Sequence, residues 1–68
     1  MHKTLEIKGM MSGHCASHVQ RALQSIAGVK ATVDLNHKTA VVEAAHMVED
    51  SVLIEVVQNA GYEVTAIY

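Results

Sequence analysis

The side chains best suited to chemistry are gathered in residues 10–15, Met-Met-Ser-Gly-His-Cys, which hold two thioethers, an imidazole and a thiol. Cys15 is the single cysteine of the chain, and it falls where a loop is predicted to deliver its thiol to the N-terminus of a helix. Free backbone N–H groups and the positive end of the helix dipole stabilise a thiolate there. A thiolate binds soft metal ions and reacts with oxidants. The same position equally fits a small apolar residue at the top of the core-facing stripe of the helix.

The elements that hold this segment are predicted from the spacing of apolar residues. Alternation of apolar and polar residues predicts strands at 3–8, 29–35, 39–44 and 62–67. Helical spacing predicts helices at 15–26 and about 50–60. We expect Gly28 to cap the C-terminal end of the first helix, and Asp50 or Ser51 to cap the N-terminal end of the second. Residues 36–38 are expected to form a hairpin turn.

The order of these elements, βαββαβ, predicts an α+β fold of the ferredoxin-like type. Each βαβ half needs a right-handed crossover, and the two halves interlock into a four-stranded antiparallel sheet with both helices on one face. The expected strand order is 4-1-3-2. This topology brings the loop 9–14, the hairpin turn and the Gly61-Tyr62 junction to one end of the sheet. His2 and His46 are expected at the opposite end.

Composition argues against several functional classes. Sixty-eight residues, half of them hydrophobic, suffice for one small domain spanning 1–68. A net charge of −2 with scattered basic residues argues against nucleic-acid binding, and no apolar run is long enough for insertion into a membrane. A free thiol without an export signal indicates the cytoplasm. The chemistry-bearing residues do not form a set of nucleophile, base and orienting group, so an enzyme is not expected.

Residues 7–15, Ile-Lys-Gly-Met-Met-Ser-Gly-His-Cys, resemble the metal-binding loop of the heavy-metal-associated domain. This family includes small copper chaperones and the N-terminal domains of copper-transporting ATPases, and its loop reads Gly-Met-x-Cys-x-x-Cys between the first strand and the first helix. The resemblance continues through Gly28-Val29 and through Ala60-Gly61-Tyr62 before the last strand. In length and in the Gly-Tyr junction, the chain is most similar to bacterial copper chaperones.

Ser12 departs from the family's loop, because it stands where the first metal-binding cysteine belongs. Cys15 matches the second. Cu(I) takes two thiolates in near-linear geometry, whereas a serine hydroxyl is hard and stays protonated near neutral pH. The chain is either a natural one-cysteine member or a form in which a cysteine has been replaced, and the family-like surroundings slightly favour replacement. We expect Cu(I) to be held more weakly than in a two-cysteine loop.

The resemblance implies a metal site built on Cys15 and Ser12, and two histidines are candidates to complete it. His14 is adjacent to Cys15 and offers a borderline ligand for copper or zinc, unless it simply faces solvent. A second chain's Cys15 would instead give a metal-bridged homodimer. His18 follows Cys15 by three residues and is either an auxiliary ligand or an exposed polar residue.

Three further residues are expected to support the loop rather than to ligate. In the family, the residue that corresponds to Met10 packs beneath the loop as an apolar anchor. Tyr62 matches a position close to the metal loop, where its hydroxyl acts on the ligands or its ring caps the core. Gly13 belongs to the loop itself. Met11 is expected to be exposed and is at most an auxiliary soft contact during transfer.

The resemblance therefore implies a cytoplasmic chaperone that carries Cu(I) in the loop before the first helix. It would pass the ion by ligand exchange to the metal-binding domain of a copper-transporting ATPase. Alternatives are the metal-binding domain of a heavy-metal transporter, a carrier of Zn(II) or Hg(II), or a protein-interaction module that has lost metal binding. Ser12 is the main support for the last. Metal binding is expected to weaken below about pH 6 to 7, as imidazole and thiolate protonate.

Overall fold

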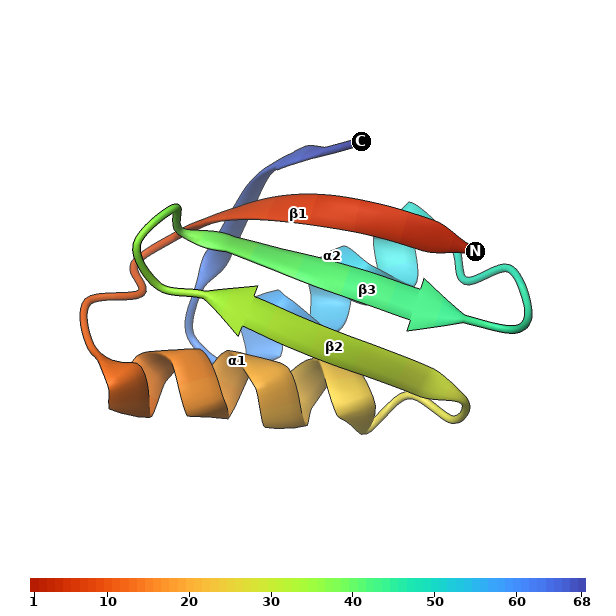
Figure 1. Cartoon of the computed structure of the whole chain (residues 1–68), viewed down its shortest axis with the longest axis horizontal. Helices are drawn as coiled ribbons and strands as arrows, with labels where there is room; N and C mark the ends of the chain where they lie inside the picture. Colours follow the sequence, from red (N-terminus) through yellow and green to blue (C-terminus); the bar gives the residue numbers. More distant parts are fainter.

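The sheet and the two helices occur in the predicted order in a computed structural model that describes all residues 1–68. The elements are β1 (His2–Lys8), α1 (Gly13–Gln24), β2 (Val29–Asp34), β3 (Thr39–Ala44), α2 (Asp50–Asn59) and β4 (Glu63–Ile67). The strands form an antiparallel sheet of order β2-β3-β1-β4, which is the predicted order, and both helices cover one of its faces (Figure 1). The ferredoxin-like α+β fold is thus confirmed.

The core fills the space between the sheet and the helices. Leu5 and Ile7 face inward from β1, and each helix contributes a short apolar stripe. The core is one cluster of eleven buried residues, all of them apolar: Leu5, Ile7, Met10, Val19, Leu23, Ala31, Ala40, Val42, Val48, Leu53 and Val57.

Neither helix is long and apolar enough to cross a membrane.

The first helix begins two residues before the predicted start at Cys15. Ser12 is its N-cap: the Ser12 backbone is extended, and its hydroxyl oxygen accepts the N–H of Cys15 at 3.5 Å. The Ser12 carbonyl accepts the N–H of Ala16 at 3.1 Å. Serine is among the preferred N-cap residues because its side chain satisfies a free N–H of the first turn. Cys15 is therefore the third residue of α1 rather than its first.

The C-terminal end of α1 was also predicted too late. The helix ends at Gln24, and Ser25 occupies the C-cap position with right-handed backbone angles. Gly28 is therefore not the cap. It adopts φ = +76° three residues later, in the turn that leads into β2. Helical spacing continued to Ile26 in the sequence because the turn after the helix also directs that side chain against the core.

Neither residue predicted to cap α2 does so. Glu49 occupies the N-cap position and makes no side-chain hydrogen bond there. The Asp50 carboxylate instead forms an ion pair with the Lys3 ammonium, which also donates to the Val48 carbonyl at 3.3 Å. Lys3 thus connects the start of β1 to the start of α2. Its ammonium neutralises the Asp50 carboxylate in the first turn of that helix.

A Schellman motif at the end of α2 sets the position of Tyr62. The N–H of Gly61 donates to the Gln58 carbonyl at 2.9 Å, and the N–H of Tyr62 donates to the Val57 carbonyl at 3.2 Å. Gly61 adopts φ = +100°, which this motif requires and which glycine accommodates without a Cβ clash. Tyr62 belongs to this motif, so β4 begins at Glu63 rather than at the predicted residue 62.

The predicted gathering of three connections at one end of the sheet is confirmed. In Figure 1 the loop after β1 and the turn between β2 and β3 lie together at one end, and the N-terminus and the β3–α2 loop lie at the other. The N–H of Ile7 donates to the Lys38 carbonyl at 2.8 Å, which joins β1 to the hairpin turn. At the far end, His2 pairs with Glu43 and His46 lies against Gly28.

Two valines on α2 test the assignment of its buried face. Val57 is fully buried, whereas Val52 is 41% exposed. Replacement of either by alanine improves helix propensity by a similar small amount, so the difference between the two variants isolates burial. We expect Val57→Ala to lower the free energy of unfolding by about 2 kcal/mol and Val52→Ala to leave it nearly unchanged. Urea unfolding measures both, and equal losses would contradict this packing.

Candidate metal site

The Cys15 sulfur lies in the first turn of α1, partly exposed and beside the N-cap. The Ser12 hydroxyl that accepts the Cys15 N–H also lies 3.6 Å from the Cys15 sulfur and donates to it. Both Ser12 and Gly13 are exposed, so the tip of the loop faces solvent. Ser12 stands at the position expected for the first ligand. Its hydroxyl instead caps the helix and donates a hydrogen bond to the Cys15 thiol.

Hydrogen bonds favour the thiolate of Cys15. The Tyr62 hydroxyl makes the largest contribution, followed by the Met11 backbone and the Ser12 hydroxyl, while partial burial opposes them. Together they lower the pKa of Cys15 from 9.0 to about 7. The same interaction raises the pKa of Tyr62, because the neutral phenol is the form that donates to the sulfur. A large share of Cys15 is therefore thiolate at neutral pH.

The ring of Tyr62 is held between β1 and α1. Gly9 adopts φ = +104°, and a Cβ built there would lie 3.4 Å from Cδ1 of Tyr62, so the tyrosine fits closely over the end of β1. The His18 ring meets the Tyr62 ring edge to face, with centroids 5.8 Å apart and planes at 84°. His18 is exposed, and this aromatic contact is the role that the structure gives it.

The two methionines of the loop differ in burial. Met10 is fully buried within the core, which leaves its sulfur enclosed by apolar side chains. Met11 is 80% exposed. His14 is exposed at the start of α1, next to Cys15 in sequence. No group of three or more His, Cys, Asp or Glu side chains is arranged to hold a metal ion.

Lys38 is a residue of this site that the sequence interpretation missed. It was placed in the hairpin turn, but its ammonium donates to the Met10 carbonyl at 2.6 Å, across 28 residues of sequence. No local pattern in the sequence signals this bond. Only the predicted topology, which brings the turn and the loop to the same end of the sheet, indicated that such a contact was geometrically available.

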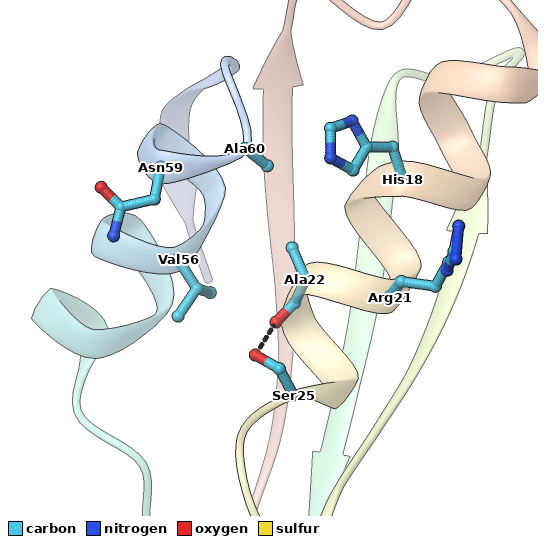
Figure 2. A pocket seen from close by; sticks show the side chains of 7 residues that line it. All are labelled: His18, Arg21, Ala22, Ser25, Val56, Asn59 and Ala60. Atoms are coloured by element: carbon cyan, nitrogen blue, oxygen red, sulfur yellow. Dashed lines mark hydrogen bonds between the residues drawn. The ribbon is translucent and has the colours of Figure 1, made fainter.

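The open groove of the molecule lies beside this site rather than at it. It has a volume of about 400 Å³ and runs between α1 and α2, with His18 and Ala60 facing each other across one end in Figure 2. Ala22 and Val56 contribute apolar surface, and Arg21 brings a cation to the rim. Cys15 does not line it, so the groove is not a pocket for an ion bound at the thiol.

Tyr62→Phe tests the cause of the lowered Cys15 pKa. The variant keeps the ring against His18 and Gly9 but removes the hydroxyl, so we expect the pKa of Cys15 to rise from about 7 toward its ordinary value of 9.0. The thiolate absorbance at 240 nm, followed against pH, measures it. Tyr68→Phe is the matched control, because the Tyr68 hydroxyl interacts with Glu6 and not with the thiol. An unchanged Cys15 pKa in Tyr62→Phe would contradict this assignment.

Sequence comparison finds relatives of this chain among the P-type ATPases. The chain is 37% identical over 62 residues to cation-transporting P-type ATPase B of Mycobacterium leprae, and 32% identical over 59 residues to a copper-exporting P-type ATPase of Mycobacterium tuberculosis. These matches cover 91% and 87% of this chain, but the chain spans only 8% of the length of either ATPase.

Solved structures match the chain over nearly its whole length. The CopZ metallochaperone is 33% identical, superposes with a TM-score of 0.88, and covers 96% of this chain and 100% of its own. Oxidized MerP from Ralstonia metallidurans is 27% identical with a TM-score of 0.86, covering 96% of this chain and 93% of its own. Residues 4–63 match the heavy-metal-associated domain, whose members are non-enzymatic metal-binding modules. The chain therefore belongs to the heavy-metal-associated domain family.

Proposed function

We propose that this chain is a cytoplasmic copper chaperone that binds Cu(I) through the thiolate of Cys15. The proposal rests on the exposure and the lowered pKa of this thiol. Cys15 is partly exposed near the N-terminus of α1, and its pKa is lowered to about 7. A soft thiolate is the donor that Cu(I) prefers. Similarity to the CopZ metallochaperone and to a copper-exporting ATPase supports copper as the cargo rather than Zn(II) or Hg(II).

The exposure of the loop suits transfer by ligand exchange. An incoming thiolate must reach the metal before the outgoing thiolate leaves, so the ion has to sit where a second protein can approach it. Ser12, Gly13 and His14 are all exposed around Cys15, and Met11 presents an apolar side chain beside them. The receiving protein in this proposal is the metal-binding domain of a copper-transporting ATPase.

The second ligand to Cu(I) comes, in this proposal, from outside the chain. The Ser12 hydroxyl is a hard donor already engaged with the Cys15 N–H and sulfur, and Met10 is enclosed in the core. A thiolate of the receiving domain completes two-coordinate Cu(I) during transfer. Before transfer, Cys15 of a second copy does so in a metal-bridged homodimer. His14 is the alternative within one chain, because it is exposed and adjacent to Cys15.

The ATPase matches favour a second candidate function. Their identity to this chain extends over most of its residues but only 8% of their own length, as expected if the corresponding region is one domain of a transporter. The chain in that case serves as the metal-binding domain of a heavy-metal transporter, with the same ligand chemistry at Cys15. Loading of copper at Cys15 is common to both functions, whereas donation of copper to a separate ATPase domain is expected of the chaperone alone.

Native mass spectrometry of the reduced protein under nitrogen, with Cu(I) added stepwise, tests the proposed site. We expect copper to appear with two chains in the wild type and to be absent from Cys15→Ala. His2→Ala is the matched control, since His2 lies at the far end of the sheet, and it should bind as the wild type does. If copper binds to a monomer and this species is lost in His14→Ala, the second ligand is His14 of the same chain rather than Cys15 of a second chain. Equal copper binding by Cys15→Ala and the wild type would overturn the proposal, and copper retained by neither would favour a protein-interaction module.

The transfer step has its own test. Copper-loaded chain is mixed under nitrogen with the metal-binding domain of a copper-transporting ATPase, and the two are separated by ion exchange. We expect copper to reach the domain faster than it reaches a low-molecular-weight chelator of equal affinity, because ligand exchange does not require free ion. Transfer at the same rate to both would show that copper is merely released, which contradicts a chaperone.

Acidification should release the metal. The pKa of Cys15 is about 7, so the thiolate fraction falls to roughly one tenth at pH 6. Because the proton competes with Cu(I) for the sulfur, affinity should be highest above pH 7 and should decline as the pH falls through 7. Competition with a chelator between pH 5.5 and 8 measures this. In Tyr62→Phe the decline should begin at a higher pH, and an affinity that is flat across the range would contradict thiolate ligation.

A further inference from the structure

We propose that Lys38 is a positioning residue that ties the metal loop to the sheet, an inference that rests on the metal-binding role proposed for that loop. Its ammonium donates to the Met10 carbonyl at 2.6 Å, in a partly buried bond between residues 28 apart in sequence. A hydrogen bond from a charged donor is stronger than one between neutral groups, and partial burial strengthens it further. Lys38 is thus a tertiary link between the hairpin turn and the entrance of the loop.

The backbone of Lys38 gives a second, independent reason to assign it a role. Lys38 adopts φ = +57° and is the only non-glycine residue of the chain with a positive φ. Side chains other than glycine, asparagine and aspartate disfavour this left-handed region because the Cβ crowds the backbone. Glycine would fit the same turn without that strain. Lys38 thus combines an unfavourable backbone conformation with a side chain that reaches the loop.

The turn is built to hold Lys38 in that conformation. The Asp34 carboxylate accepts the N–H of His37 at 3.1 Å through one oxygen and meets Nδ1 of His37 at 2.7 Å through the other. This arrangement fixes the residue before Lys38. The carbonyl of Lys38 accepts the N–H of Ile7 at 2.8 Å, so its backbone is attached to β1 while its side chain is attached to the loop.

Met10 is consequently held on two sides. Its side chain is fully buried in the core, and its carbonyl receives the ammonium of Lys38. Met11 follows it, and then Ser12 caps α1 and donates to the Cys15 sulfur. Only Met11 separates the fixed residue from the helix cap. Removal of the ammonium frees one side of Met10, and we expect the added motion to appear in the amides of Met11 and Ser12.

Three variants of the metal-free protein test this role. Lys38→Met keeps the length and the strained backbone but lacks the donor. Lys38→Gly lacks the donor and removes the strain. Lys8→Met is the matched control, because it removes an exposed lysine at the end of β1 that makes no side-chain hydrogen bond or ion pair. We expect the NMR order parameters of the Met11 and Ser12 amides to fall from about 0.85 toward about 0.6 in both Lys38 variants and to stay unchanged in Lys8→Met.

Urea unfolding separates the side chain from the backbone. We expect the midpoint of Lys38→Gly to lie above that of Lys38→Met, because only the glycine relieves the positive φ. Loop amides that remain rigid in both Lys38 variants would overturn the proposal. Loosening in Lys38→Gly alone would also overturn it, since that result reflects the flexibility of glycine and not the loss of the ammonium.

Copper release distinguishes this proposal from the proposed function. From copper-loaded protein, both Lys38 variants should lose Cu(I) to a chelator roughly ten- to a hundredfold faster than the wild type, as expected for the net loss of one hydrogen bond from a charged donor. If the wild-type protein does not bind copper, the proposed function is contradicted. The order parameters of the metal-free protein still decide whether Lys38 orders the loop. A loosened loop with unchanged copper release would overturn the positioning role for the metal.

Discussion

The effect of the Tyr62 hydroxyl on the Cys15 thiol links the two halves of the chain, because Tyr62 makes the largest contribution to the lowered pKa of Cys15. The first half supplies Cys15 through a helix capped by Ser12. The second half supplies Tyr62 through the Schellman motif at Gly61. Gly9 and His18 then hold the tyrosine ring over the loop. Neither half by itself would provide both the sulfur and the hydroxyl that lowers its pKa.

Ser12 gives the loop a hard donor that also caps the first helix. A cysteine at this position would be a soft ligand and a weak helix cap, whereas serine is a preferred cap and a hard donor. Its hydroxyl accepts the Cys15 N–H and donates to the sulfur, so it favours both the start of α1 and the thiolate. The chain thereby presents one activated thiolate instead of a two-sulfur clamp. In the proposed function, another molecule supplies the second sulfur to Cu(I), and the same arrangement would pass copper between proteins.

Much of the fold could be predicted from the sequence, because alternation in 3–8 and 39–44 and helical spacing around Val19 and Leu23 are direct consequences of one buried face. The right-handed crossover rule then gave the strand order. The ends of the helices were less predictable, since Ser12 acts as a cap through its side chain while Asp50 pairs with Lys3 instead. The Lys38 bond to Met10 was not predictable, because it depends on a positive φ in the turn and on a distance between segments 28 residues apart.

X-ray absorption at the copper edge tests whether the sulfur of Cys15 binds copper. The wild-type protein and Cys15→Ala are each mixed with one equivalent of Cu(I) under nitrogen and freed of unbound ion. We expect sulfur neighbours around copper in the wild type, two for each copper in the bridged form, and no retained copper in Cys15→Ala. Copper bound only to nitrogen or oxygen in the wild type, or the same sulfur signal in Cys15→Ala, would contradict this expectation.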